Sequence, residues 1–311
     1  MLFLNTAIDG LQLGLCYAVV AMGMYIAFSV LDFPDLTADG SFPLGGVVGT
    51  ILIYRCSFNP VLALLGAFAA GVVAGSITGV LHVKFNISKL LSSIIVMTGL
   101  LSVTLALTKL LTKTGFTTVN FSYTANGFDG LFNTGNTVLN DSAVILILAV
   151  IVIAVKLLLD GYFKTKSGFM LKATGNNESL VTSLGKDVGF YKILGLAVAN
   201  GLTALSGALY AQLTRNYDNT SGTGKVVLAL ASVIIGLAIF SKAKHVKDTP
   251  AVIIGAVIYS LCLNYFTVID SDGTYLKLMN AVCFALILIV NNYIKKNRVK
   301  KAKEISGGEK R

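Results

Sequence analysis

The sequence predicts an all-α, polytopic membrane protein with about 8–10 transmembrane or re-entrant helices arranged in two pseudo-symmetric halves. Mean hydropathy is +0.77 and only 13% of the 311 residues are charged, about half the charged fraction of an ordinary soluble domain. In addition, nine long apolar stretches without a charged side chain are spread along the chain. Such uniformly apolar segments lack the alternation of barrel strands, so we expect a helical bundle.

Five of these stretches are long enough to cross a ~30 Å hydrocarbon layer as single helices, which takes about 20 residues. They are residues 10–31, 56–83, 90–108, 193–214 and 249–269. The other four stretches are shorter: residues 41–54, 142–155, 226–241 and 278–294. We expect these to span only if they tilt, extend through flanking residues or lie inside the bundle.

The basic residues are concentrated in four places, and their positions predict the topology. Of 25 Lys and Arg residues, 19 lie in residues 84–89, 156–192, 242–247 and 295–311. By the positive-inside rule these segments are cytoplasmic, and nine crossings then place the N-terminus outside. The net charge of +10 is therefore assigned to the lipid membrane, with no nucleic-acid partner. We expect a membrane domain over residues 1–294 and a basic cytoplasmic tail over residues 295–311.

A segment rich in helix breakers follows the first apolar stretch, over residues 31–43. It contains two prolines, one glycine and three carboxylates, which belong to Asp32, Asp35 and Asp39. Proline lacks the N–H donor of a helix and clashes with the preceding turn, so the backbone must open here. Open backbone and carboxylates at membrane depth are typical of substrate routes in transporters. A loop at the membrane surface is the alternative, but the stretch that follows is too short to span unless part of this segment lies in the membrane.

An internal repeat with one constant offset along the chain supports two related halves. It aligns Gly23 with Gly207, Asp32 with Asn216, Phe33 with Tyr217 and Gly40 with Gly224. Pseudo-symmetric halves are common in transporters. Asn216 and Tyr217 are therefore expected to be the counterparts of the Asp32 segment across a pseudo-twofold axis.

A second informative segment lies in the basic, cytoplasmic connection at residues 167–187. The pattern predicts a short helix that Gly175 ends, followed by a second helix that Asn176 or Asn177 begins. A compact helix-turn-helix between two spans would offer a shaped surface to a cytoplasmic partner, although a simple linker explains the residues almost as well.

Two blocks of sequence carry a family resemblance that covers nearly the whole chain. The block G-x-x-L-K-A-T-G-x-N from Gly168, with Gly185 ten residues after Gly175, resembles the coupling loop of permease subunits of bacterial ABC importers for branched-chain amino acids, ribose and related solutes. The block L-D-F-P-D-L-T from Leu31 and the block D-G-S-F-P-L-G from Asp39 resemble a subgroup proposed to carry aromatic amino acids such as tryptophan or tyrosine.

The resemblance implies a homodimeric permease in the bacterial cytoplasmic membrane, with two ABC ATPase subunits and an extracytoplasmic substrate-binding lipoprotein as partners. Coupling to the ATPase would fall in a cytoplasmic segment of about residues 161–190, on Gly168, Leu171, Lys172, Ala173, Thr174, Gly175, Asn176 and Glu178. Lys172 stands where many relatives have arginine. The substrate pathway would fall on Asp32, Phe33, Asp35, Asp39, Asn216 and Tyr217.

The chain itself is not expected to be an enzyme, and we expect no catalytic residue, cofactor or metal site. No G-x-x-x-x-G-K-[ST] motif occurs, because Lys225 is followed by Val226 and residue 219 is Asn. A different class of protein remains open: an ion-coupled secondary transporter could use the carboxylates of Asp32, Asp35 and Asp39 as proton or cation sites.

Overall fold

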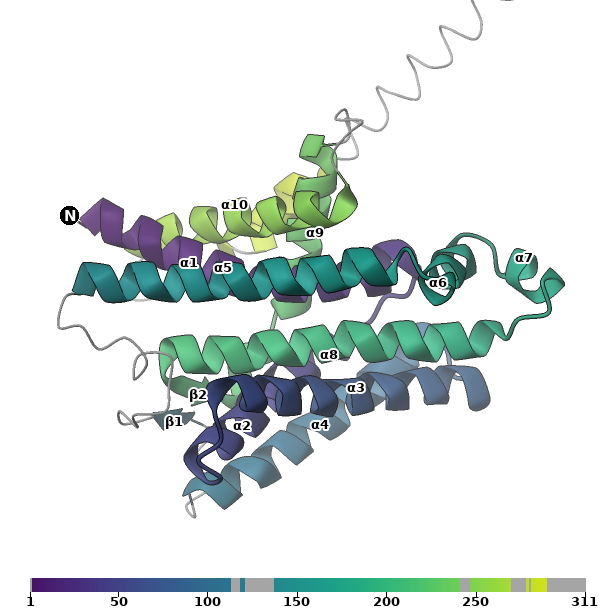
Figure 1. The fold of residues 1–311 in the computed structure, drawn as a ribbon, viewed down its shortest axis with the longest axis horizontal. Helices are drawn as coiled ribbons and strands as arrows, with labels where there is room; N and C mark the ends of the chain where they lie inside the picture. Colours follow the sequence, from purple (N-terminus) through teal and green to yellow (C-terminus); the bar gives the residue numbers. More distant parts are fainter. Residues whose placement is uncertain are drawn as a thin grey trace, which may run out of the picture.

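The computed structural model describes residues 2–112, 118–120, 137–240, 247–269, 278–279 and 281–289. Figure 1 shows long helices lying side by side, with two short helices at one end of the bundle. The elements are α1 (Leu2–Met24), a π-helix η1 (Tyr25–Val30), α2 (Ala38–Tyr54), α3 (Pro60–Lys84), α4 (Lys89–Thr112), β1 (Thr118–Asn120), α5 (Thr137–Tyr162), α6 (Lys166–Asn176), α7 (Glu178–Ser183), α8 (Val188–Thr214), β2 (Asn216–Asp218), a 3₁₀ helix η3 (Asn219–Gly222), α9 (Lys225–Phe240) and α10 (Asp248–Ile269).

Seven helices in the described part of the chain are long and apolar enough to cross a membrane. α2 is shorter, with 17 residues, or about 26 Å at 1.5 Å per residue. It is not among these seven helices, and it begins three residues before the short apolar stretch at residues 41–54. The all-α, polytopic fold class is therefore confirmed. The predicted tail at residues 295–311 lies outside the described residues.

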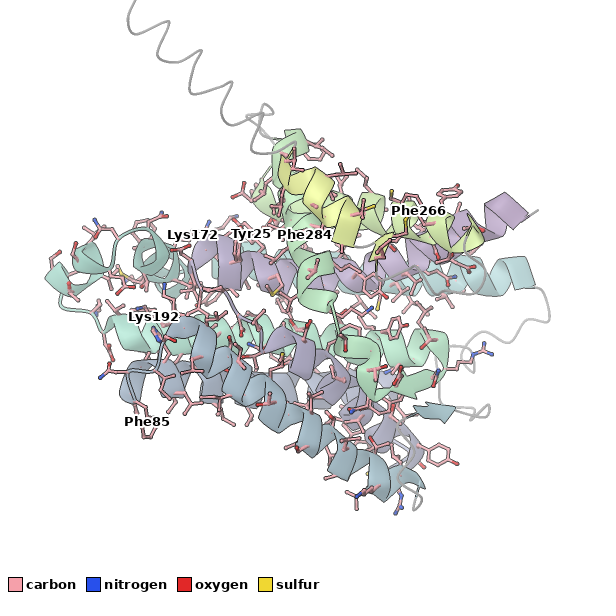
Figure 2. The ribbon with its side chains drawn as sticks, turned by 180° about the vertical axis from the view of Figure 1, so that it is seen from behind. Tyr25, Phe85, Lys172, Lys192, Phe266 and Phe284 are labelled. Carbon is pink, nitrogen blue, oxygen red and sulfur yellow. The ribbon has the colours of Figure 1, made fainter. Side chains whose placement is uncertain are left out.

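Basic side chains gather at one end of the bundle. Figure 2 places Phe85, Lys172 and Lys192 at this end and Phe266 at the other. Lys247 also lies here, because its Nζ is 3.6 Å from a carboxylate oxygen of Asp160 near the end of α5. By the positive-inside rule this end faces the cytoplasm. We call it the basic end and the opposite end the outer end.

The described helices agree with the internal repeat at one boundary. η1 ends at Val30 and α8 ends at Thr214, which is the same offset as between Gly23 and Gly207. α1 runs toward the basic end, whereas its counterpart α8 runs away from it (Figure 1). The two halves are therefore inverted relative to each other, as in many transporters.

The closest packing joins helices of different halves. α3 packs along α8, and α1 packs along α10, which is the same pairing after the two halves are exchanged. Along α3, Gly71 and Gly75 meet the backbone of Asn200 and Leu196, where a Cβ would overlap main-chain atoms. Glycine at four-residue spacing lets helix backbones approach within the membrane.

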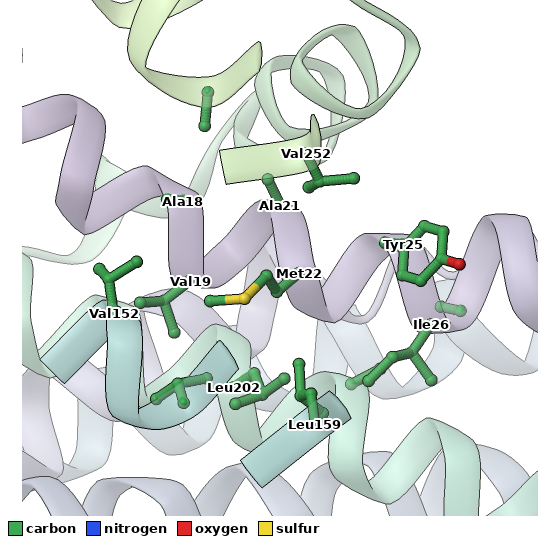
Figure 3. Packing of buried hydrophobic residues seen from close by; sticks show 14 of the residues in the cluster. Ala18, Val19, Ala21, Met22, Tyr25, Ile26, Val152, Leu159, Leu202 and Val252 are labelled. Carbon is green, nitrogen blue, oxygen red and sulfur yellow. The ribbon is translucent and has the colours of Figure 1, made fainter. Parts of the chain in front are cut away.

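The apolar core surrounds α1. Figure 3 shows Val19 and Met22 of α1 beside Leu202 of α8 and Val152 and Leu159 of α5. Each of these five side chains is at most 5% exposed. Most residues of α1 in the middle of the bundle are buried, so this helix is enclosed by protein on all sides.

Candidate functional site

The helix break predicted at residues 31–43 is shorter than expected, because α2 begins at Ala38 and continues through Gly40 and Pro43, which leaves residues 31–37 as the non-helical stretch. The chain leaves α1 through the π-helix η1, and Asp32 then adopts a left-handed conformation with φ of 51°. An extended stretch follows to Thr37, where the backbone turns into α2. Thr37 is fully buried, and its hydroxyl is 2.9 Å from that of Thr78 on α3. Asp35 and Thr37 are therefore buried in the bundle, whereas Asp32 and Pro34 at the start of the segment are exposed.

Asp35 is the centre of a buried polar network in this segment. Its side chain is 1% exposed, and Oδ2 accepts a 2.6 Å hydrogen bond from Asn200 Nδ2 on α8. The other oxygen, Oδ1, accepts from the backbone N–H of Thr37 at 2.9 Å. Ser41 donates to Asn200 Oδ1 at 2.7 Å. The network thus joins the broken segment, the first turns of α2 and the middle of α8.

Asp39 connects the break to the second half of the chain. Its carboxylate accepts hydrogen bonds from the backbone N–H groups of Val226, at 2.8 Å, and Gly224, at 3.3 Å, at the start of α9. A carboxylate is favoured there because the first N–H groups of a helix have no partner within the helix. Gly222 lets the two segments approach, since a Cβ there would overlap the carbonyl oxygen of Asp39.

The other predicted pathway residues are not brought to one place. Asp32 is exposed at the basic end, where its carbonyl accepts a 2.9 Å hydrogen bond from Lys89 Nζ. Phe33 is 1% exposed and packs edge-on against the His82 ring. Asn216 and Tyr217 lie in β2 at the outer end (Figure 1), where Tyr217 pairs with Val119 of β1. The inverted repeat explains this separation, because counterparts fall at opposite ends.

The structure adds a cluster that the sequence did not predict. The Nζ of Lys225 donates a 2.8 Å hydrogen bond to the hydroxyl of Tyr17. It lies 4.2 Å from the centre of the Tyr17 ring, 5.0 Å from that of Tyr210 and 5.2 Å from that of Phe42. The four residues come from four helices, α9, α1, α8 and α2, so no local pattern could reveal them. We call these residues the Lys225 cluster.

The predicted helix-turn-helix is present as α6 and α7. Thr165 begins α6, with its hydroxyl accepting from the N–H of Gly168, and Asn177 begins α7, with its Oδ1 accepting from the N–H of Leu180. The prediction that Gly175 ends the first helix is wrong, because α6 continues to Asn176. Gly175 serves instead as a contact point. A Cβ at this position would overlap the carbonyl oxygen of Val30.

The predicted coupling residues divide between two faces of this segment. Gly168, Leu171 and Thr174 are buried, and Ala173 and Gly175 are half-buried. Lys172, Asn176 and Glu178 are exposed. The buried face packs on the end of η1, where Leu171 and Leu31 both lie against Gly195 of α8. The segment therefore touches the broken helix directly and leaves its other face free for a partner.

The exposed face carries both apolar and charged groups. Phe169, Leu180 and Leu184 are 63%, 48% and 53% exposed. Lys172 Nζ lies 4.5 Å from the centre of the Phe163 ring, and Figure 2 shows this lysine at the basic end. Exposed apolar side chains rimmed by charge are typical of protein interaction sites.

Comparison with known proteins identifies the family. Residues 6–291 match the family model "Branched-chain amino acid transport system / permease component". The chain belongs to this permease family. It is 38% identical to the "Tyrosine transport system permease protein" of Clostridioides difficile (strain R20291), over 89% of this chain and 88% of that one. It is 25% identical to the "Ribose import permease protein RbsC" of Escherichia coli (strain K12), over 93% and 86% of the two chains.

A solved structure also matches, "PsaBC from Streptococcus pneumoniae in complex with Fab". It shares 17% sequence identity and covers 84% of this chain and 91% of that chain. The TM-score is 0.37, which is too low to support an argument from fold. The family match and the membrane-spanning helices together make the chain a multi-pass protein of the bacterial membrane and a permease of the ABC importer branch. The members of this permease family are transport subunits, and the described residues contain no group of three or more potential metal ligands.

Proposed function

We propose that this chain is the membrane-spanning subunit of an ATP-driven importer and forms the route for an aromatic amino acid. Its partners are two ATPase subunits at the basic end, a second copy of the chain, and an extracytoplasmic binding lipoprotein that delivers the solute. The tyrosine transport permease, 38% identical over most of both chains, supports an aromatic amino acid as the solute.

The observation that carries the proposal is the contact between α6 and the broken helix. ATP binding on a separate subunit can change the bundle only by favouring one of two arrangements. The exposed face of α6 and α7 is available to such a subunit, and its buried face contacts Val30 and Leu31 through Gly175. From there the chain runs directly to Asp35 and its bond with Asn200. A displacement of α6 therefore reaches the buried polar network within a few residues.

The arrangement of carboxylates gives less support to an ion-coupled transporter. Asp32 is exposed at the basic end, Asp35 is bound to Asn200, and Asp39 is bound to the start of α9. The three carboxylates therefore do not converge on a single cation site, as a shared ion-binding role would need.

Co-purification and uptake together test the proposal. The C-terminally tagged chain is extracted gently from its own membrane with and without a non-hydrolysable ATP analogue, and L-tyrosine uptake is measured in cells with and without the chain. We expect a stoichiometric ATPase subunit, and uptake that needs both the chain and ATP. Uptake that persists without ATP and collapses with the ion gradient would instead support the secondary transporter.

Reversing the charge of Lys172 is expected to uncouple the importer. Lys172 is exposed on α6, and Lys172→Glu removes only its contact with the Phe163 ring, worth about 0.5–1 kcal/mol. Folded yield should therefore change little, while ATP-driven uptake falls at least about tenfold through charge repulsion at the docking face. Lys84→Glu makes the same change at an exposed site at the end of α3, outside the predicted coupling segment, and should transport normally. Normal uptake by Lys172→Glu would remove this residue from the coupling surface.

A further inference from the structure

We propose that the Lys225 cluster is a binding site for a zwitterionic aromatic amino acid, with Lys225 taking the carboxylate. The inference rests on the proposed function and extends it from a general route to a defined site. Lys225 would hold the carboxylate, the rings of Tyr17, Phe42 and Tyr210 would contact the aromatic side chain, and Asp39 would face the amino group.

Lys225 is a basic side chain at the start of α9, within the bundle. No carboxylate in the described part of the chain lies within 4.0 Å of its Nζ. Of the described contacts at Nζ, one is the hydroxyl of Tyr17 and the others are ring faces. Ionisable groups within membrane bundles are costly and normally have a charged partner or a functional role. The carboxylate of Asp39 is near enough to interact with Lys225 through its charge but makes no direct ion pair with Nζ, and a ligand carboxylate would supply that direct pair.

The rings around Lys225 match the rest of such a ligand. The Tyr17 and Tyr210 rings are stacked, with centres 5.9 Å apart, and the centres of Phe42 and Tyr210 are 5.6 Å apart. Aromatic side chains favour offset-stacked and edge-on neighbours, and each such contact is worth about 0.5–1.5 kcal/mol. An apolar aliphatic side chain would fill the same place without this gain.

Asp39 completes the chemistry of a zwitterion. Its carboxylate lies beside the backbone of Lys225 because it accepts from the N–H groups of both neighbouring residues. The backbone N–H of Lys225 is a third donor to this carboxylate, and an ionised carboxylate has about four acceptor positions, so one position remains. An ammonium group of the ligand can therefore bind to Asp39 while its carboxylate binds to Lys225.

The cluster is placed where a solute from outside would arrive. α9 begins just after β2 and η3 at the outer end, and Thr223, two residues before Lys225, is exposed. The internal repeat relates Lys225 to Ser41, which bonds to Asn200 in the Asp35 network. The two polar positions are thus counterparts in the two halves, and Phe42, which follows Ser41, contacts Lys225 directly.

The absence of tryptophan from the sequence provides a direct test. Tyr210 is half-buried, so Tyr210→Trp places a single fluorophore in the cluster, and Phe85→Trp places one on an exposed site at the basic end as a control. The full chain in lipid nanodiscs is titrated with L-phenylalanine up to about 10 mM, a range that includes weak sites. Phenethylamine, 3-phenylpropionate and L-leucine lack, in turn, the carboxylate, the amino group and the ring.

We expect saturable quenching or a spectral shift with L-phenylalanine in the Tyr210→Trp chain, weaker responses to all three analogues, and none in the Phe85→Trp chain. Adding Lys225→Met should weaken L-phenylalanine binding at least about tenfold and remove its preference over phenethylamine, while Lys225→Arg should retain that preference. A purely structural lysine would alter stability but not this preference. A folded Tyr210→Trp chain with no response, or with a preference that Lys225→Met leaves unchanged, overturns the inference.

The uptake assay separates this inference from the proposed function. ATP-dependent uptake of L-tyrosine without a response at Tyr210→Trp would leave the importer standing and remove the site. Binding with the expected preference but without ATP-dependent uptake would keep the site and remove the importer.

Discussion

Replacing Gly45 with valine is expected to prevent the permease from folding. A Cβ at Gly45 would overlap the carbonyl group of Ala204, so the contact is between α2 and the backbone of α8 and not with a flexible side chain. Overpacking a core costs about 1–3 kcal/mol even when side chains can yield, and a backbone contact offers less relief. We therefore expect a loss of about 3 kcal/mol or more, and aggregated protein on size-exclusion chromatography in detergent.

Gly99→Val provides the matched control for Gly45→Val. Gly99 lies in the middle of α4 and is exposed, and a Cβ there would meet nothing within 4 Å. The substitution should leave the yield of monodisperse protein and its Tm nearly unchanged. A monodisperse Gly45→Val protein with the parent Tm would contradict the packing of α2 on α8.

The Asp35→Asn variant is expected to fold but to transport at least about tenfold more slowly. Both oxygens of Asp35 accept hydrogen bonds, one from Asn200 and one from the N–H of Thr37. An amide has only one oxygen, so in either orientation its NH₂ group would face a donor. Asn200 cannot compensate by rotating its amide group, because its own oxygen accepts a hydrogen bond from Ser41 and its nitrogen also donates to the carbonyl of Leu196.

The predicted cost of the Asp35→Asn change, about 1–3 kcal/mol for one unsatisfied buried group, is small enough to leave a folded bundle. Uptake is therefore normalised to the amount of folded protein in the membrane. Asp32→Asn makes the same chemical change at an exposed side chain of the same segment, and asparagine tolerates the left-handed backbone found there. It should transport normally. Equal losses of folded protein and uptake for Asp35→Asn would assign Asp35 to structure alone.

The sequence predicted the features of this fold that depend on local composition. Apolar length predicts the spans, because each spanning helix must satisfy its own backbone hydrogen bonds and be apolar along its length. The placement of lysines predicts the direction of the spans, because basic flanking residues stay on the cytoplasmic side. The prolines and carboxylates at residues 31–43 predicted a broken helix, which the structure confirms for residues 31–37, whereas Pro43 lies inside α2. The repeat was visible in a few aligned residues, and the matching ends of η1 and α8 agree with it.

The features that the sequence did not predict depend on contacts between distant elements. Gly175 was assigned to a helix end, because glycine is common there. The structure instead shows α6 continuing through it, and the space left by the missing side chain is taken by Val30. Lys225 had no visible role, because its aromatic neighbours come from three other helices.

The pairing of α3 with α8 and of α1 with α10 limits how this protein can move. Each half of the chain packs a long helix against the other half through glycine contacts that leave little room for sliding. The halves are thus interlocked, and neither can rotate as a rigid body against the other without breaking these contacts. The movable parts are the pieces outside the paired helices, namely the extended stretch before α2, the turn before α9 and the α6–α7 pair. Transport by this permease would then depend on local movements of these segments, while the paired long helices stay in place.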